Sequence, residues 1–175
     1  FPELILTTDM FAYNVAQQVY IDSEIKLIPD YFFIDQKKIF NSTPKVGNQH
    51  PTYFSQNIQN LHFNDIDCIV FFIKNKFKCD ELTKNNSNVL VVRNHPTENP
   101  KKYMGLMKKF KNIEIQIDQN KNFIETLRNT SYVVGLDTNP MFVSLKLGMP
   151  VFCSSPDFQW NMSADLGKVI YVRDI

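Results

Sequence analysis

The residues most suited to chemistry follow an apolar run at 89–92. Arg93, His95 and Glu98 come directly after it, with Pro96 between them. Arg93 carries a forked cation that suits phosphate or carboxylate, and His95 can donate to a phosphate oxygen or shuttle a proton. Pro96 favours an extended His95 that projects from a strand end. Glu98 would orient Arg93 or His95, or cap the next helix. The pattern predicts a ligand-binding loop, with an ordinary loop as the alternative.

A second candidate segment follows another apolar strand pattern. Gly135 would let a ligand or a neighbouring backbone approach closely. Thr138 or Asn139 suits a helix N-cap, and Pro140 suits the first helical turn. The free backbone N–H groups of a helix start, together with the positive end of its dipole, form an anion site. Asp137 suits a sugar hydroxyl, although its charge would repel a phosphate. A plain capped helix is the alternative.

Other segments carry weaker signals. Ser154 follows a strand pattern, so its hydroxyl would be able to contact a ligand, whereas His50-Pro51 has no strand pattern before it and reads as a loop. The sequence contains no P-loop, no G-x-G-x-x-G, no G-x-S-x-G and no H-E-x-x-H motif. Its 3 cysteines are widely spaced and form no Cys/His cluster, so we expect no metal and no cofactor.

Apolar periodicity places these segments in alternating strands and helices. Strands are expected at 3–7, 25–28, 67–73, 89–92, 113–117, 132–136, 150–153 and 169–172. Helices are expected from Thr8 or Asp9 to Tyr20 and over 99–110, 122–128 and 140–147. The continuous apolar run at 67–73 is typical of a strand covered on both faces, and 31–39 reads as an extended continuation.

This alternation over short loops predicts an α/β fold with a Rossmann-like, doubly wound, mostly parallel sheet. Ligands bind such sheets outside the carboxyl ends of the strands, where both candidate segments are expected. We expect residues 1–39 to be the end of an N-terminal α/β domain or a first βαβ unit. Residues 40–64, rich in Asn, Ser, Gln and Pro, are expected to be a linker, and 65–175 the main Rossmann-like domain.

The composition argues against several classes of protein. The 175 residues hold 19 Lys and Arg against 18 Asp and Glu, a net charge of +1, so we expect no nucleic-acid partner. No apolar run is long enough to span a bilayer and no signal peptide is recognisable, so we expect no transmembrane segment; peripheral membrane association stays open. The sparse cysteines favour a reducing, cytoplasmic setting. Because the chain begins at Phe1 without Met and ends just after a strand pattern, we expect a piece of a longer protein.

The order of the motifs resembles a known family. A strand that ends in Arg93-x-His95-Pro96-x-Glu98 is followed by a strand that ends in glycine, a Ser/Thr at a helix start, and then Gly-x-Pro-Val at 148–151. This order resembles the C-terminal, donor-binding domain of bacterial glycosyltransferases with two facing Rossmann-like domains. The sialyltransferase and polysialyltransferase groups of surface-polysaccharide enzymes are the most similar in these motifs. The stretch 27–31, Leu-Ile-Pro-Asp-Tyr, resembles the end of their N-terminal domain.

The resemblance implies metal-independent transfer of a sugar, with sialic acid as one candidate, from a CMP- or UDP-linked donor to a surface-glycan acceptor. It implies that His95 is the catalytic residue. The residues expected to bind the donor or its phosphate are Arg93, His95, Glu98, Gly135, Asp137, Thr138, Asn139 and Ser154.

The chain departs from this family at one position. Many relatives carry a glutamate that binds the donor where this sequence has Val143, and either a CMP-linked donor or a degenerate site would fit the change. The acidic general base of the family lies in its N-terminal domain, and Asp9 is a faint candidate for it here. Two alternatives therefore remain open: a non-catalytic binding or assembly module, and a nucleotide-sugar epimerase or hydrolase on the same architecture.

Overall fold

The structure is a computed structural model, and it describes residues 2–45, 47–56, 63–99, 101–120, 122–158, 162 and 168–175. The chain forms two compact units, Phe1–Ile39 and Phe40–Ile175. The second unit contains nearly all of the buried hydrophobic residues of the described chain.

The first unit is a β–α–β motif that leads into a further helix. β1 (Leu4–Thr7) and β2 (Glu24–Leu27) pair in parallel and α1 (Met10–Val19) connects them, as the sequence predicts. The next element, α2 (Tyr31–Ser42), is a helix, so the prediction of an extended segment at 31–39 is wrong. Asp30 explains the difference, because its carboxylate accepts the Phe33 N–H at 2.9 Å and caps the first turn.

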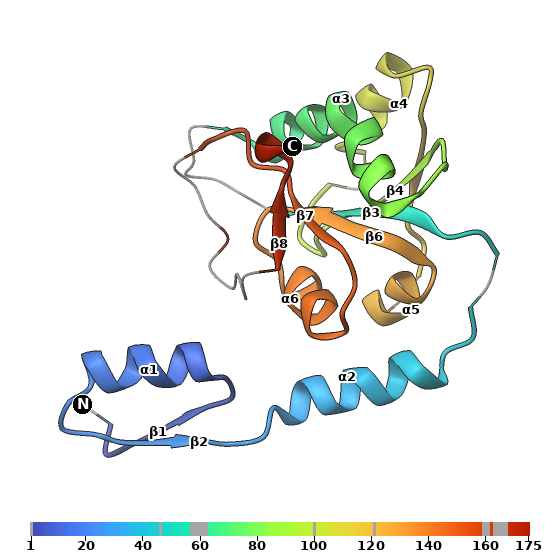
Figure 1. The fold of residues 1–175 in the computed structure, drawn as a ribbon. Coiled ribbons are helices and arrows are strands. Elements are labelled where there is room, and N and C mark those ends of the chain that lie inside the picture. Colours follow the sequence, from blue (N-terminus) through green and yellow to red (C-terminus); the bar gives the residue numbers. More distant parts are fainter. Residues whose placement is uncertain are drawn as a thin grey trace. The chain divides into compact units, whose positions relative to one another are not determined.

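The second unit is built on a six-stranded parallel sheet (Figure 1). Its strands are β3 (His50–Phe54), β4 (Val89–Arg93), β5 (Glu114–Ile117), β6 (Thr130–Gly135), β7 (Val151–Cys153) and β8 (Val169–Tyr171). They lie in the order β5-β4-β3-β6-β7-β8, and every neighbouring pair is parallel. Counted from the first strand of the unit, this order is 3-2-1-4-5-6, the doubly wound Rossmann order. The predicted α/β fold class is confirmed.

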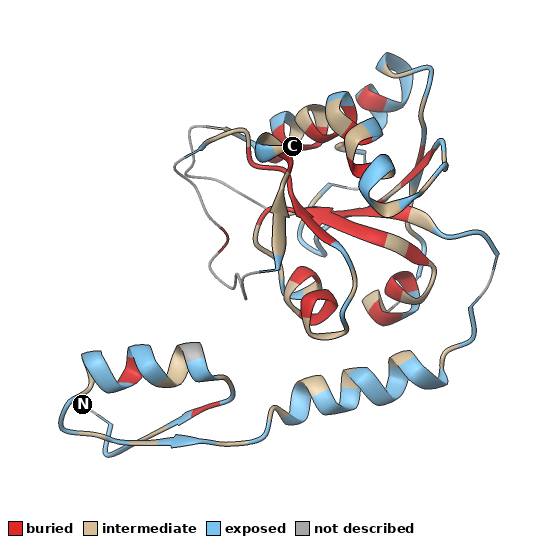
Figure 2. Ribbon diagram, in the orientation of Figure 1, coloured by how far each residue is buried: buried red, intermediate tan, exposed pale blue. Residues whose placement is uncertain are grey.

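Helices cover both faces of this sheet. α3 (Asp65–Thr83) and α4 (Met104–Lys109) lie on one face, and α5 (Phe123–Arg128) and α6 (Asn139–Lys146) lie on the other (Figure 1). Buried residues concentrate in the strands and on the helix sides that face them (Figure 2). The helix expected over 99–110 begins only at Met104. Because all six strands run in parallel, their carboxyl ends share one edge of the sheet.

Helix α3 occupies the segment that the sequence predicts as a strand at 67–73, so that prediction is wrong. Its buried positions recur every three or four residues and continue beyond the apolar run to Lys76 and Cys79, which is the helical period. Asn64 and Asp67 form a capping box at its start. Val70 and Phe71 are only partly buried, but they complete the apolar run and hide this period in the sequence.

Strand β3 lies within 40–64, so the interpretation of that segment as a linker, and of His50-Pro51 as loop, is wrong there. Pro51 cannot donate to a sheet ladder and argues against a central strand. It is accommodated because the pairing of β3 with β6 shifts register between His50 and Thr52, as at a β-bulge. β3 pairs with β4 on one side and β6 on the other, so the missed element is the first strand of the Rossmann order.

Candidate functional site

A pocket lies where the strand order of the sheet reverses, between β3 and β6. It has a volume of about 350 Å³. The residues that line it follow the carboxyl ends of β3, β4 and β6, with Phe123 added from α5: Phe54, Ser55, Gln56, Arg93, Asn94, His95, Pro96, Asp137, Thr138, Asn139 and Pro140. We call it the carboxyl-edge pocket. The structure therefore brings the two predicted segments together at the place where doubly wound sheets bind their ligands.

Arg93 lines this pocket, but its guanidinium is already engaged. Its Nη1 pairs with the carboxylate of Asp118, and it donates to the Asn120 carbonyl at 2.9 Å and to Thr126 Oγ1 at 3.1 Å. The side chain of Arg93 is 20% exposed and that of Asp118 is 3% exposed. Arg93 therefore ties β4 to the segment after β5, and a bound anion would share its charge with Asp118.

His95 is exposed at the pocket and is held by local hydrogen bonds. Its Nδ1 lies 2.8 Å from Thr97 Oγ1, and its backbone N–H donates to Glu98 Oε2 at 3.0 Å. Nε2 is therefore the ring nitrogen left to contact a ligand. Because both the backbone and the ring are fixed, His95 is positioned before any ligand arrives.

Glu98 does not line the pocket but supports it from behind. Its Oε2 accepts hydrogen bonds from the Ser55 hydroxyl and the His95 backbone, and its Oε1 lies 2.5 Å from Lys102 Nζ. Burial raises the pKa of Glu98, but the hydrogen bonds from Lys102, Ser55 and His95 outweigh it, so the pKa lies below its ordinary value. Of the predicted roles, the contacts fit that of orienting the His95 loop.

Asp65, at the start of α3, is the centre of a buried polar cluster that sequence reasoning missed. It is 2% exposed, and its carboxylate accepts hydrogen bonds from Tyr53 Oη at 2.7 Å, from Lys102 Nζ at 3.0 Å and from the hydroxyl of Tyr103. Ser55 Oγ lies 3.2 Å from the same carboxylate. Burial and the charge of Asp65 raise the pKa of both tyrosines, so they remain neutral donors. Asp65 follows the N-cap of a helix whose existence the sequence analysis did not predict; the capping box at 64–67 is the signal that could have found it.

The start of α6 forms the other wall of the pocket. Thr138 is the N-cap, but its side chain makes no capping hydrogen bond, and its buried Oγ1 has no partner among the described residues. Pro140 occupies the first turn, as predicted. The hydroxyl of Thr138 is therefore an unsatisfied buried polar group beside the positive end of the helix. Asp137 also lines the pocket, and its backbone N–H donates to Gln56 Oε1 at 3.1 Å.

Gly135 and Ser154 lie apart from the pocket lining. A Cβ at Gly135 would lie 2.7 Å from Met141 Sδ and 2.9 Å from the Phe54 carbonyl, so this glycine admits a neighbouring backbone rather than a ligand. Ser154 is fully buried, and its hydroxyl donates to the Gly135 carbonyl at 3.1 Å. Neither placement supports the donor contact that the sequence analysis expects. Val143 is 1% exposed and also lies outside the lining.

Within the described part of the chain, no three or more His, Cys, Asp or Glu side chains come together in a group that could hold a metal ion. Nor does any helix found there have the length and apolar character needed to cross a membrane.

Comparisons with known proteins place the fold. No protein-family model and no curated protein matches the sequence. Two structures of UDP-GlcNAc 2-epimerase from Methanocaldococcus jannaschii match with TM-scores of 0.58 and 0.57 at 14% identity, over 98% and 99% of this chain and 51% and 52% of theirs. The first of these holds UDP-GlcNAc and UDP. A match to Thermosulfurimonas dismutans KpsC, a beta Kdo 2,4 transferase, has a TM-score of 0.40 at 14% identity, over 73% of this chain and 46% of that one, and supports no assignment by itself.

The similarity to the two epimerase structures shows a shared Rossmann-like fold. The chain spans about half the length of the epimerase structures it matches.

Proposed function

We propose that this chain binds the nucleoside-phosphate part of a nucleotide-sugar in the carboxyl-edge pocket. The observation that carries the proposal is the convergence of the loops after β3, β4 and β6 on one pocket at the strand-order reversal. The UDP-GlcNAc and UDP held by the structurally similar epimerase support the same class of ligand.

The pocket suits an anion that is recognised mainly by neutral donors. His95 Nε2, the Thr138 hydroxyl and the Asn139 amide supply hydrogen bonds without a fixed negative partner of their own. Arg93 adds positive charge, which Asp118 partly offsets. Asp137 would lie against a sugar hydroxyl rather than against the phosphate, because two anions in contact repel.

The first candidate reaction is transfer of the sugar to a glycan acceptor. When the bond between the sugar and the phosphate breaks, negative charge builds up on the departing phosphate, and donors aimed at it lower the barrier. His95, Thr138 and Asn139 would carry that role. The acceptor hydroxyl also needs a general base. Among the described residues that line the pocket, the carboxylate is that of Asp137, which we assign to the donor sugar. We infer that the general base comes from outside this pocket, as the resemblance to two-domain glycosyltransferases implies. CMP-linked sialic acid and UDP-linked sugars are both candidate donors.

The second candidate is epimerisation or hydrolysis of the nucleotide-sugar. The fold shared with an epimerase over nearly the whole chain favours it. Both candidates begin with the same departure of the nucleotide, so the same pocket residues would serve either one. They differ in whether an acceptor is required.

Calorimetry with UDP and CMP tests the binding proposal. We expect the 1–175 chain to bind at least one of them at millimolar concentration. His95→Ala should weaken that binding by about 1–3 kcal/mol, the effect of losing a hydrogen bond to a charged group. Asn48→Ala, in an exposed loop outside the pocket, is the matched control and should bind as the wild type does. Absence of binding for both nucleotides would overturn the proposal.

A product assay on the full-length gene product separates the two reactions. Nucleotide released from the donor without any acceptor supports the hydrolase, and conversion of the donor into an epimeric nucleotide-sugar, without net release, supports the epimerase. Release that depends on an added glycan supports the transferase. Nucleotide binding with neither release of nucleotide nor conversion of the sugar supports the non-catalytic module, which the buried Val143 favours.

A further inference from the structure

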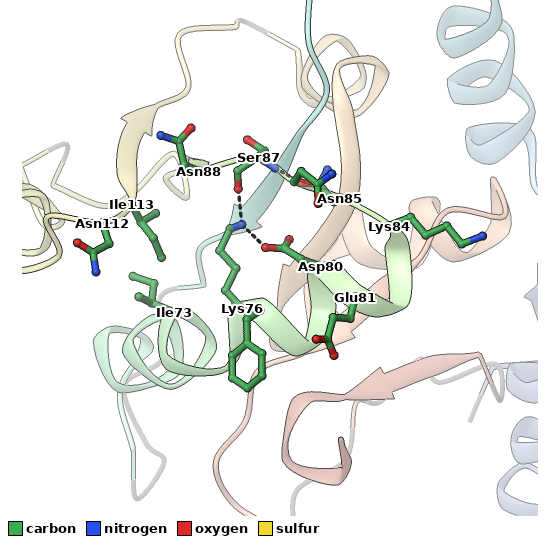
Figure 3. Close-up of a pocket in the computed structure, with 12 residues that line it drawn as sticks. Ile73, Lys76, Asp80, Glu81, Lys84, Asn85, Ser87, Asn88, Asn112 and Ile113 are labelled. Carbon is green, nitrogen blue, oxygen red and sulfur yellow. Dashed lines mark hydrogen bonds and ion pairs between the residues drawn. The ribbon is translucent and has the colours of Figure 1, made fainter.

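A second pocket lies at the opposite edge of the sheet, before β4 and β5 begin. It has a volume of about 530 Å³. It is lined by the C-terminal half of α3, by the loop 84–88 that leads into β4, and by Asn112 and Ile113, which precede β5 (Figure 3). No residue that lines the carboxyl-edge pocket lines this one. We call it the amino-edge pocket.

A buried ion pair forms part of the wall of this pocket. Lys76 is 5% exposed, and its ammonium lies 2.6 Å from Asp80 Oδ2 and 2.6 Å from the Ser87 carbonyl (Figure 3). Tyr132 donates to the other oxygen of Asp80 at 2.8 Å. An ammonium has three N–H donors, so one of those on Lys76 is left for a ligand. Because Asp80 neutralises Lys76, the pair adds hydrogen-bonding capacity to the pocket without adding net charge.

The remaining wall is rich in amides and carries apolar surface. The side chains of Asn86, Asn88 and Asn112 are exposed and make no hydrogen bond with any other described residue. Each amide offers an acceptor and two donors. Phe77, with 59% of its surface exposed, and Ile113 supply apolar surface to the same pocket.

The loop that carries Asn86 and Asn88 is held in place by its own hydrogen bonds. Lys84 adopts a left-handed conformation with φ of 54°, and the Asn85 N–H donates to the Asp80 carbonyl at 2.9 Å. Asn85 Oδ1 accepts the Ser87 N–H at 2.8 Å, and Ser87 Oγ lies 2.6 Å from His50 Nδ1 of β3. A ligand would therefore meet preformed groups, and little further ordering would oppose its binding.

We propose that the amino-edge pocket binds a neutral sugar ring of a glycan. A sugar hydroxyl can donate one hydrogen bond and accept others. It can therefore pair with the amides of Asn86, Asn88 and Asn112, which donate and accept, and with the third N–H of Lys76, which donates. The C–H face of a pyranose packs on a flat apolar ring such as Phe77. A phosphate fits less well, because the ammonium at the wall is already paired with a carboxylate. This site is separate from the carboxyl-edge pocket, and the proposal does not depend on nucleotide binding there.

NMR titration of the 1–175 chain with a panel of neutral disaccharides built from glucose, galactose and N-acetylglucosamine tests this proposal. We expect at least one disaccharide to bind in the millimolar range. Asn88→Ala and Asn112→Ala should each weaken its binding about three- to tenfold, the effect of one neutral hydrogen bond. Phe77→Ala should weaken it as well, through loss of the apolar face.

Matched controls separate this site from general damage. Asn48→Ala and Phe32→Ala change an exposed amide and a half-exposed ring outside the pocket, and should leave sugar binding unchanged. A UDP titration of every variant should match the wild type, so loss of sugar binding and loss of nucleotide binding are read independently. If no disaccharide binds at tens of millimolar, or if the bound one is insensitive to Asn88, Asn112 and Phe77, the proposal is wrong.

Discussion

Lys102 holds two carboxylates at once behind the carboxyl-edge pocket. Its ammonium lies 2.5 Å from Glu98 and 3.0 Å from Asp65, so three charged groups share one poorly exposed region. Burial lowers the pKa of Lys102, but its hydrogen bonds and charge interactions with Glu98 and Asp65 outweigh it, and the pKa is raised. Because Glu98 also accepts the His95 N–H, this cluster connects the stability of the fold to the position of the histidine.

The pH dependence of stability should report on Glu98. Its pKa is lower in the folded protein than in the unfolded chain, so its contribution is fully present above the unfolded pKa and is lost as pH falls through the folded one. At neutral pH we expect Glu98→Gln to lower the free energy of unfolding by about 1–3 kcal/mol, because a hydrogen-bonded buried charge is removed. Urea unfolding from about pH 7 to about pH 3, a range that spans the ordinary glutamate pKa, measures it.

The difference in free energy of unfolding between Glu98→Gln and the wild type should become smaller as the pH falls, because a protonated glutamate resembles glutamine. Glu81→Gln, on the exposed side of α3, is the control and should follow the wild type at every pH. A constant difference across the whole range would contradict the assigned role of Glu98.

Sequence reasoning found the residues of the site better than their partners. Arg93, His95, Asp137, Thr138 and Asn139 all line one pocket because strand-end loops of a parallel sheet must share an edge. The pairing of Arg93 with Asp118 joins positions 25 residues apart, and no local sequence pattern predicts it. The Asp65 cluster stayed hidden for the same reason, since it is made by side chains from three separate elements.

At the level of elements, the close packing of β6 against its neighbours is concentrated at Gly135. Its missing side chain lets the Phe54 carbonyl of β3 and Met141 of α6 approach. The sulfur of Met141 can shift, but the backbone of Phe54 lies in a central strand and cannot do so cheaply. This position therefore couples the spacing of β3, β6 and α6, the three elements whose ends form most of the pocket.

Gly135→Ala should lower the free energy of unfolding by about 1–3 kcal/mol, the usual effect of overpacking a tight core. Gly105→Ala is the matched control: it lies in α4 with nothing within 4 Å of its added Cβ, so it should be neutral or slightly stabilising. Urea denaturation of both variants measures the contrast. If the two variants had equal free energies of unfolding, β6 and β3 would be able to move apart to make room for the added Cβ without destabilising the protein.

Elements with a clean period or a local start signal were predicted from sequence, and elements that break those rules were not. β4, β6 and α6 match their apolar patterns and strand-end residues. β3 escaped because Pro51 and the polar residues before it imitate a loop, although a bulge accommodates the proline. α3 escaped because its outer face is partly apolar, so seven consecutive residues imitate a buried strand.

At the scale of the whole molecule, the two units differ in how many of their side chains are buried in a hydrophobic core. In the described part of Phe1–Ile39, Thr7 and Ala16 are the buried residues, whereas Ile21 is 82% exposed and Val19 59% exposed. A two-stranded sheet with one helix leaves most of its apolar side chains in water. The second unit has a six-stranded sheet with helices on both faces and a continuous cluster of buried side chains.

We therefore expect the fragment 40–175 to fold on its own and the peptide 1–39 to remain largely unfolded. Below about 40 residues, a chain without disulfides or metal rarely buries enough surface to offset its conformational entropy. Circular dichroism should show a cooperative urea transition for 40–175 with a midpoint close to that of the full chain, and no cooperative transition for 1–39. A fragment 40–175 that unfolds at much lower urea would mean that the first unit contributes stability which its own core does not reveal.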